Sequence, residues 1–157
     1  MKNLLFKILL IIFLFPFKLA FSNHVLLSSY SFSNLLLKLA ESEYEKKMGL
    51  MYLDKLVDVE GMFFIYKKPK IIKMWMHNTK IPLDIIFIDE SKKVISINNG
   101  IPFSKRIISS KTKAVAVIEI PHKCSKKLKI KKGDKINWST IKNKKNKNIR
   151  YYHCLAK

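Results

Sequence analysis

The stretch at residues 74–89, MWMHNTKIPLDIIFID, constrains the fold more than any other part of the chain. Two apolar runs, Met74–Met76 and Leu83–Ile88, are rich in aromatic and β-branched residues and are too short for helices, so both predict strands. Between them, residues 77–82 supply turn chemistry, because Asn and Thr side chains bond nearby backbone and proline fixes φ. We therefore expect two strands joined by a polar turn at the centre of the fold.

The remaining apolar pattern predicts a mainly β domain. Ser42 and Glu45 have the spacing of a capping box, which predicts a short helix from about Glu43 to Gly49. Lys67–Lys70 is expected to form a turn, and the segment from Asn98 to about Thr112 to be irregular. Further strands are expected near residues 25–27, 35–39, 61–66, 94–97, 114–120 and 135–138, with a helical turn or two at 124–130. The sum is a compact barrel-like or sandwich domain of seven to nine short strands with one or two short helices.

The N-terminus has the layout of a secretory signal. Residues 1–22 begin with lysines, continue with the apolar run ILLIIFLFPF at 8–17, and end in Ala20-Phe21-Ser22. An uncleaved anchor is the alternative, but the run falls short of the ~20 apolar residues that a membrane span needs. We therefore predict cleavage near Ser22, an exported, periplasmic or secreted protein, one domain at 23–139 and a Lys/Asn-rich tail at 140–157.

The chain carries a formal charge of +20, which raises nucleic acid or an anionic membrane as a partner. Among its 31 basic residues only Arg106 and Arg150 are arginine, the side chain favoured for bidentate recognition of phosphates and guanine edges. Nucleic acid is therefore not an expected partner. Peripheral contact of the basic tail with an anionic envelope surface stays open, at about 1 kcal/mol for each basic residue near the membrane.

The two cysteines, Cys124 and Cys154, have no Cys-x-x-Cys spacing. In an oxidising compartment they predict a disulfide that ties the tail to the domain. A zinc site would need His122 and His153 as well, and that spacing is not an established ligand pattern. We predict neither a metal nor a cofactor.

The order of several motifs resembles the bacterial and archaeal family called domain of unknown function 192. The motifs are GLMY at 49–52, GMFFIY at 61–66, MHNTKIPLDIIFID at 76–89, IEIP at 118–121 and KGD at 132–134. The resemblance spans about residues 35–136 and implies a compact, mostly β, often exported domain with no assigned activity. Leu53 stands where the family commonly has a basic residue, and PHK at 121–123 replaces its usual Pro-Ala-Gly turn.

Two acids lie inside apolar strands, Asp84 within LDII and Glu119 within IEI. A buried carboxylate must be paired or hydrogen-bonded, or its pKa rises. One hypothesis is a hydrolase that uses this pair as acid and base, which requires the carboxyl groups to face one cleft. The alternative, which we favour, is that Asp84 accepts backbone hydrogen bonds from the 78–82 turn and holds its shape.

No nucleophile or glycine-rich cradle accompanies the acids, so we assign no catalytic residue. The main prediction is an exported, non-enzymatic module that binds a small ligand or an envelope component beside the 77–82 turn. Apolar and polar groups mix there in the manner of a small-ligand site. The predicted ligand-binding residues are Met76, Asn78, Thr79 and Asp84, with Trp75 and Glu119 nearby.

Overall fold

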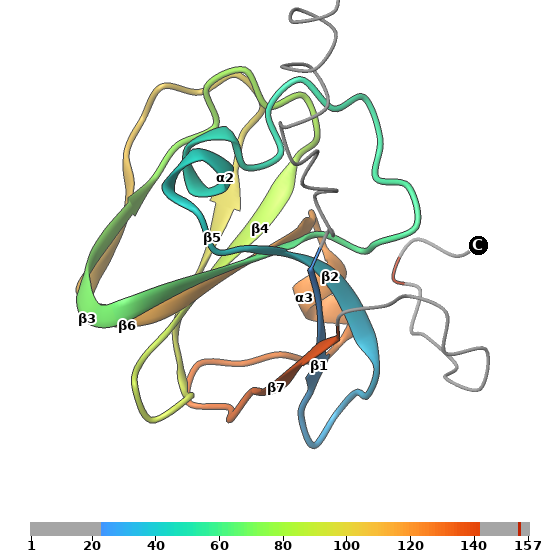
Figure 1. Cartoon of the computed structure of the whole chain (residues 1–157), viewed down its shortest axis with the longest axis vertical. Coiled ribbons are helices and arrows are strands. Elements are labelled where there is room, and N and C mark those ends of the chain that lie inside the picture. The colour runs from blue at the N-terminus through green and yellow to red at the C-terminus, as the bar shows by residue number, and fades with distance from the viewer. Residues whose placement is uncertain (1–22, 142–153, 155–157) are drawn as a thin grey trace, which may run out of the picture.

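A single seven-stranded sheet, curled into a half-barrel, makes up most of the computed structural model, which describes residues 23–141 and Cys154 (Figure 1). The order across the sheet is β5-β4-β6-β3-β2-β1-β7, antiparallel except where β2 meets β3. The strands are β1 (His24–Ser28), β2 (Leu35–Ala40), β3 (Met62–Met74), β4 (Leu83–Ile88), β5 (Val94–Gly100), β6 (Ile108–Pro121) and β7 (Asn137–Ile141). The mainly β prediction and its barrel-like form are confirmed, and the sandwich form is wrong.

Strand β4 lies between β5 and β6, and all six of its residues are buried. A strand covered on both faces is apolar throughout, as LDIIFI is apart from its acid. Each face of the sheet packs one apolar cluster. One cluster includes Phe63, Ile86, Ile118, Ile120 and Cys124. The other includes Phe64, Ile85, Phe87, Met74 and Val117.

The two longest strands, β3 and β6, differ from expectation. The predicted turn at Lys67–Lys70 is wrong, because β3 continues through it to Met74, and β6 begins at Ile108 within the segment expected to be irregular. The pairing register with β6 breaks between Ile65 and Lys70, and this irregularity accommodates Pro69 within β3 in place of a separate turn. Both strands bend sharply at the same place in Figure 1. Residues 74–76, predicted as a strand of their own, are instead the last residue of β3 and the two residues that follow it.

The predicted helix is confirmed as α2 (Glu43–Met48). Ser42 Oγ accepts a hydrogen bond from Glu45 N at 3.2 Å, and Glu45 Oε2 accepts one from Ser42 N at 3.0 Å, completing the capping box. Gly49 ends the helix at φ +51°, a conformation that favours glycine. The second helix, α3 (Cys124–Lys127), has four residues. No helix in the described part of the chain has the length and apolar character needed to cross a membrane.

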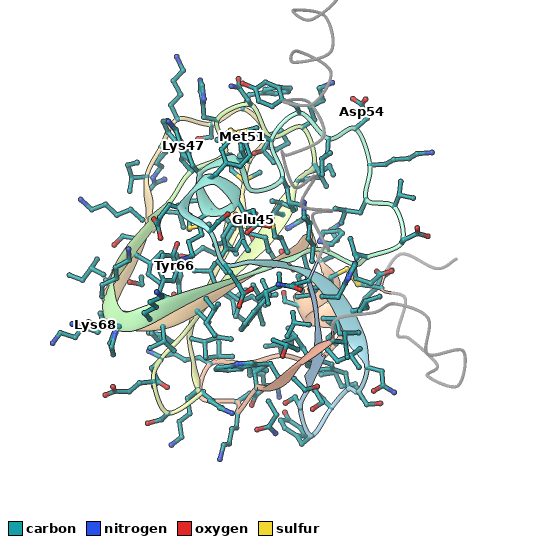
Figure 2. All side chains as sticks on the ribbon, viewed as in Figure 1. Glu45, Lys47, Met51, Asp54, Tyr66 and Lys68 are labelled. Carbon is teal, nitrogen blue, oxygen red and sulfur yellow. A yellow bond between two sulfur atoms is a disulfide. The ribbon has the colours of Figure 1, made fainter. Side chains whose placement is uncertain are left out.

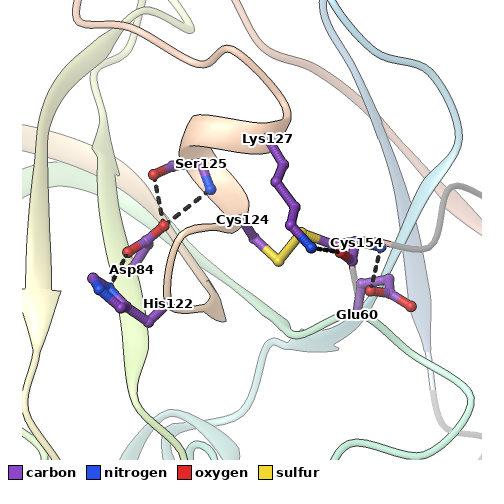
Figure 3. The surroundings of a disulfide bond; sticks show 7 residues. All are labelled: Glu60, Asp84, His122, Cys124, Ser125, Lys127 and Cys154. Atoms are coloured by element: carbon purple, nitrogen blue, oxygen red, sulfur yellow. Dashed lines mark hydrogen bonds and ion pairs between the residues drawn. A yellow bond between two sulfur atoms is a disulfide. The ribbon is translucent and has the colours of Figure 1, made fainter. Parts of the chain in front are cut away.

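A disulfide joins Cys124, at the start of α3, to Cys154, with Cα atoms 5.7 Å apart (Figure 3). Glu60 accepts a hydrogen bond from Cys154 N at 2.8 Å, and Lys127 Nζ donates to Cys154 O at 3.0 Å. A bridge across 30 residues stabilises the fold by about 3–4 kcal/mol in the chain-entropy model. The predicted signal at residues 1–22, and all of the tail beyond Ile141 except Cys154, lie outside the described residues.

Candidate functional site

A cavity of about 170 Å³ lies between the C-terminal end of α2, strands β3 and β6, and the residues after β3. Figure 2 shows Tyr66 on β3 below α2, with Lys47 and Met51 towards the opposite side of the helix. The walls mix aromatic, thioether and lysine side chains around one acid. The lining residues are Lys46, Lys47, Met48, Gly49, Leu50, Met51, Phe64, Tyr66, Lys73, Met74, Trp75, Thr79 and Glu119.

Glu119 is the buried acid of this cavity, and its residue is 4% exposed. A Cβ placed on Gly49 would lie 3.8 Å from its Oε2 atom, so the carboxyl reaches the end of α2. Its backbone carbonyl oxygen is packed against Gly61, where an added Cβ would come within 2.0 Å of it. Among residues 23–141 and Cys154, no hydrogen bond or ion pair reaches the carboxyl of Glu119.

Burial raises the pKa of Glu119 from 4.5 to about 8, because the charged form loses its hydration. Near neutral pH the group is therefore mostly a neutral acid, which can donate a hydrogen bond. A titratable group shifted by desolvation and facing a cavity is a recognised marker of a functional site.

Tyr66 and Lys46 make the wall between the cavity and the surface. Burial raises the pKa of Tyr66 to about 12, with Glu43 and Glu119 adding to the effect, so its hydroxyl stays protonated. Lys46 Nζ lies 4.8 Å from the centre of the Tyr66 ring and 3.1 Å from Glu43 Oε1. Its charge is thus already shared between a carboxylate and an aromatic face.

Asp84 belongs to the other face of the sheet. In the ladder between β4 and β6, Asp84 pairs with Ile120, whereas Glu119 pairs with Ile85. Paired residues share a face and successive residues alternate, so the two carboxyl groups point to opposite sides. The acid and base pair of the hydrolase hypothesis is therefore not assembled.

The carboxylate of Asp84 organises the turn that leads into α3 (Figure 3). Ser125 donates to Oδ2 from its backbone N at 2.9 Å and from its hydroxyl at 2.6 Å, and His122 Nδ1 lies 3.0 Å from Oδ1. The expectation that Asp84 holds the 78–82 turn is wrong, because its hydrogen-bond partners lie at residues 122–125. The acid does stabilise a turn, but one 38 to 41 residues away in sequence.

Asn78 and Met76 hold the segment after β3. Asn78 adopts φ +56° and donates from Nδ2 to the Tyr52 hydroxyl at 2.7 Å, while Tyr52 N donates to the Asn78 carbonyl. Met76 is fully buried against Gly100. Of the six residues predicted to bind a ligand, Trp75, Thr79 and Glu119 therefore line the cavity, whereas Met76, Asn78 and Asp84 do not.

Sequence reasoning missed the half of the cavity that α2 supplies. Lys46 and Gly49 come from the end of that helix, and Tyr66 comes from β3. The GLM motif after the helix was the available signal, but nothing local indicates that it faces Glu119. Among the described residues, no three His, Cys, Asp or Glu side chains gather as a metal site would require.

Comparison with known proteins places the chain in a class of small β domains without an assigned activity. The family model described as DUF192, an uncharacterized ACR, matches residues 27–138. The chain belongs to this domain of unknown function 192 family, as the resemblance of its motifs predicted. No curated protein matches the chain.

Two crystal structures share the fold. A protein of unknown function from Novosphingobium aromaticivorans is 35% identical, with a TM-score of 0.66 over 73% of this chain and 84% of that one. A candidate transcription regulator from Sinorhizobium meliloti is 28% identical, with a TM-score of 0.68 over 77% of this chain and 97% of that one. These similarities establish the fold, and any activity has to be inferred from the geometry of the site.

Replacing Asp84 by Ala should destabilise the fold, because two donors of Ser125 lose their buried acceptor. We expect the free energy of unfolding in urea to fall by about 3 kcal/mol, with faster hydrogen exchange at the Ser125 amide. The matched variant His122→Ala removes one contact to a half-exposed ring and should cost about 1 kcal/mol. Equal losses in the two variants would contradict the assigned role of Asp84.

The raised pKa of Glu119 predicts a pH dependence of stability. Between pH 4.5 and about 8 the folded protein binds a proton that the unfolded chain releases, so stability falls as pH rises. Relative to Glu119→Gln, the wild type should lose about 1.4 kcal/mol per pH unit across this window and no more above it. Urea unfolding at several pH values measures this difference. Glu90→Gln, at an exposed turn position, should follow the wild type, and a Glu119→Gln curve parallel to both would disprove the shift.

Proposed function

We propose that this domain is a binding module for a small molecule held in the cavity around Glu119. The observation that carries the proposal is a buried carboxyl group that faces a cavity and receives no hydrogen bond from the described residues. A titratable group whose pKa is shifted by burial and that faces a cavity is a marker of a functional site, and the binding of a small ligand is the role that this cavity favours.

The size of the cavity limits the ligand. At about 170 Å³ it is close to the ~150 Å³ engineered cavity that accepts benzene, and below the range of drug-sized pockets. Phe64 and Met74 supply buried apolar wall, while Thr79 and Glu119 supply polar atoms. A compound of about ten non-hydrogen atoms or fewer fits this combination.

A screen of such small compounds tests the proposal through stability and fluorescence. Trp75 lines the cavity, whereas Trp138 packs on Phe63 with ring centres 5.3 Å apart. The Trp138→Phe protein therefore reports on the cavity through Trp75 alone. We expect at least one class of compounds to raise the melting temperature and to change the Trp75 emission with a common dissociation constant.

A variant that reduces the cavity provides the control. Thr79→Met introduces a longer side chain into the wall and should weaken binding at least tenfold, since bound ligand and new side chain compete for space. Thr112→Met makes the same change at an exposed position and should bind as the wild type does. A full screen without a hit, or hits that Thr79→Met leaves unchanged, would refute a ligand site here.

We also propose that the protein is exported. Support comes from the apolar N-terminal run followed by Ala20-Phe21-Ser22, and from a cysteine pair that lies at bonding distance within the fold. Disulfides form and persist in oxidising compartments such as the periplasm. Export would also give the binding module access to compounds outside the cytoplasm.

The mass of the protein recovered from outside the bacterial cytoplasm tests export and the bridge together. We expect a chain that begins at Asn23 and gains the mass of two hydrogens on reduction. Recovery of the intact chain from Met1, in the cytoplasmic fraction and with free thiols, would show that the protein is not exported.

A further inference from the structure

We propose that the ligand of the cavity is a small zwitterion, with an ammonium group that pairs with Glu119 and a carboxylate that faces the lysines at the rim. This inference rests on the proposed binding function and names the chemistry of the ligand. Three observations support it: an acid without a counter-charge, aromatic side chains that favour a cation, and a rim of opposite sign.

The acid lacks a cation of its own. Three lysines line the cavity, yet burial is the cause that sets the pKa of Glu119, and no ion pair with its carboxyl exists among the described residues. Lys46 is occupied by Glu43 and the Tyr66 ring. An ammonium group that enters from outside would supply the missing counter-charge and stabilise the carboxylate.

The surroundings of the carboxyl favour a cation. Phe64 and Trp75 line the same cavity, and aromatic faces attract ammonium groups, whereas the Tyr66 ring already carries Lys46 and Lys70. An anionic or neutral group at the depth of Glu119 would not gain this attraction.

The rim has the opposite sign. The side chains of Lys47 and Lys73 belong to exposed residues that line the cavity. They would repel a simple cation on entry, but they match a carboxylate at the outer end of a ligand whose ammonium group lies deep. The small volume of the cavity keeps the two ends a few bonds apart.

This arrangement predicts that the carboxyl proton of Glu119 is released when the ligand binds. Near pH 7 Glu119 is mostly neutral, because burial raises its pKa to about 8. An ammonium group that arrives beside it stabilises the carboxylate, so the acid gives its proton to the buffer as the ligand binds. A ligand that only accepts a hydrogen bond from the neutral acid would release none.

Calorimetry with three probes of equal length tests the inference: 5-aminopentanoate, pentanoate and pentylamine. At pH 7, in two buffers of different ionisation enthalpy, 5-aminopentanoate should bind with release of close to one proton per site. Pentanoate and pentylamine, which each lack one charge, should bind at least tenfold more weakly. Tight binding of pentanoate, or binding of 5-aminopentanoate without proton release, would overturn the assignment.

Matched variants locate each end of the probe. Glu119→Gln should abolish proton release and weaken 5-aminopentanoate at least tenfold, while Glu90→Gln should change neither. Lys73→Met should weaken 5-aminopentanoate but leave pentylamine unchanged or tighter, and Lys113→Met, at an exposed position on β6, serves as its control. Binding that survives Glu119→Gln would contradict the inference.

The outcomes separate this inference from the proposed function. If compounds without an ammonium group bind the cavity and 5-aminopentanoate does not, the ligand class is wrong while the binding module stands. If no small compound of any class binds, both proposals fail.

Discussion

The register between β4 and β6 is the constraint on which the rest of the structure depends. Asp84 opposite Ile120, and Glu119 opposite Ile85, place two acids of neighbouring strands on different faces of one sheet. A shift of β4 by one residue against β6 would turn the side chains of β4 to the opposite faces and bring Asp84 onto the face of Glu119. The alternating apolar residues in both clusters therefore hold each acid in its own environment.

The two environments give the acids different tasks. Asp84 meets three polar atoms of the 122–125 turn and is fully used as a structural acceptor. Glu119 faces a cavity with aromatic, thioether and lysine walls, and its burial costs stability without a hydrogen bond or ion pair from the described part of the fold. Proteins tolerate such a cost where it serves binding or catalysis. This contrast is why the cavity, and not the more polar Asp84 cluster, carries the functional proposal.

Much of the fold could be predicted from sequence because its signals are local. The apolar run of β4 and the capping box of α2 each lie within a few residues, and both elements appear where they were expected. The failure at Lys67–Lys70 has a tertiary origin, since β6 pairs with β3 on both sides of this segment and makes it an irregularity within one long strand instead of a turn between two. The site was half predictable. Glu119 and Thr79 could be found, but the approach of Gly49 to Glu119, and the partners of Asp84, depend on contacts between residues distant in sequence.

The contact of Gly61 with the main chain of residue 119 has a consequence for how this cavity can change. Because the carbonyl oxygen of that residue occupies the space of a Cβ at position 61, the backbone beneath the acid is fixed from outside, whatever side chain it carries. The main chain at position 119 therefore stays in the same place relative to the cavity. A different side chain at this position would change the polarity of the cavity while the main chain around it kept its shape.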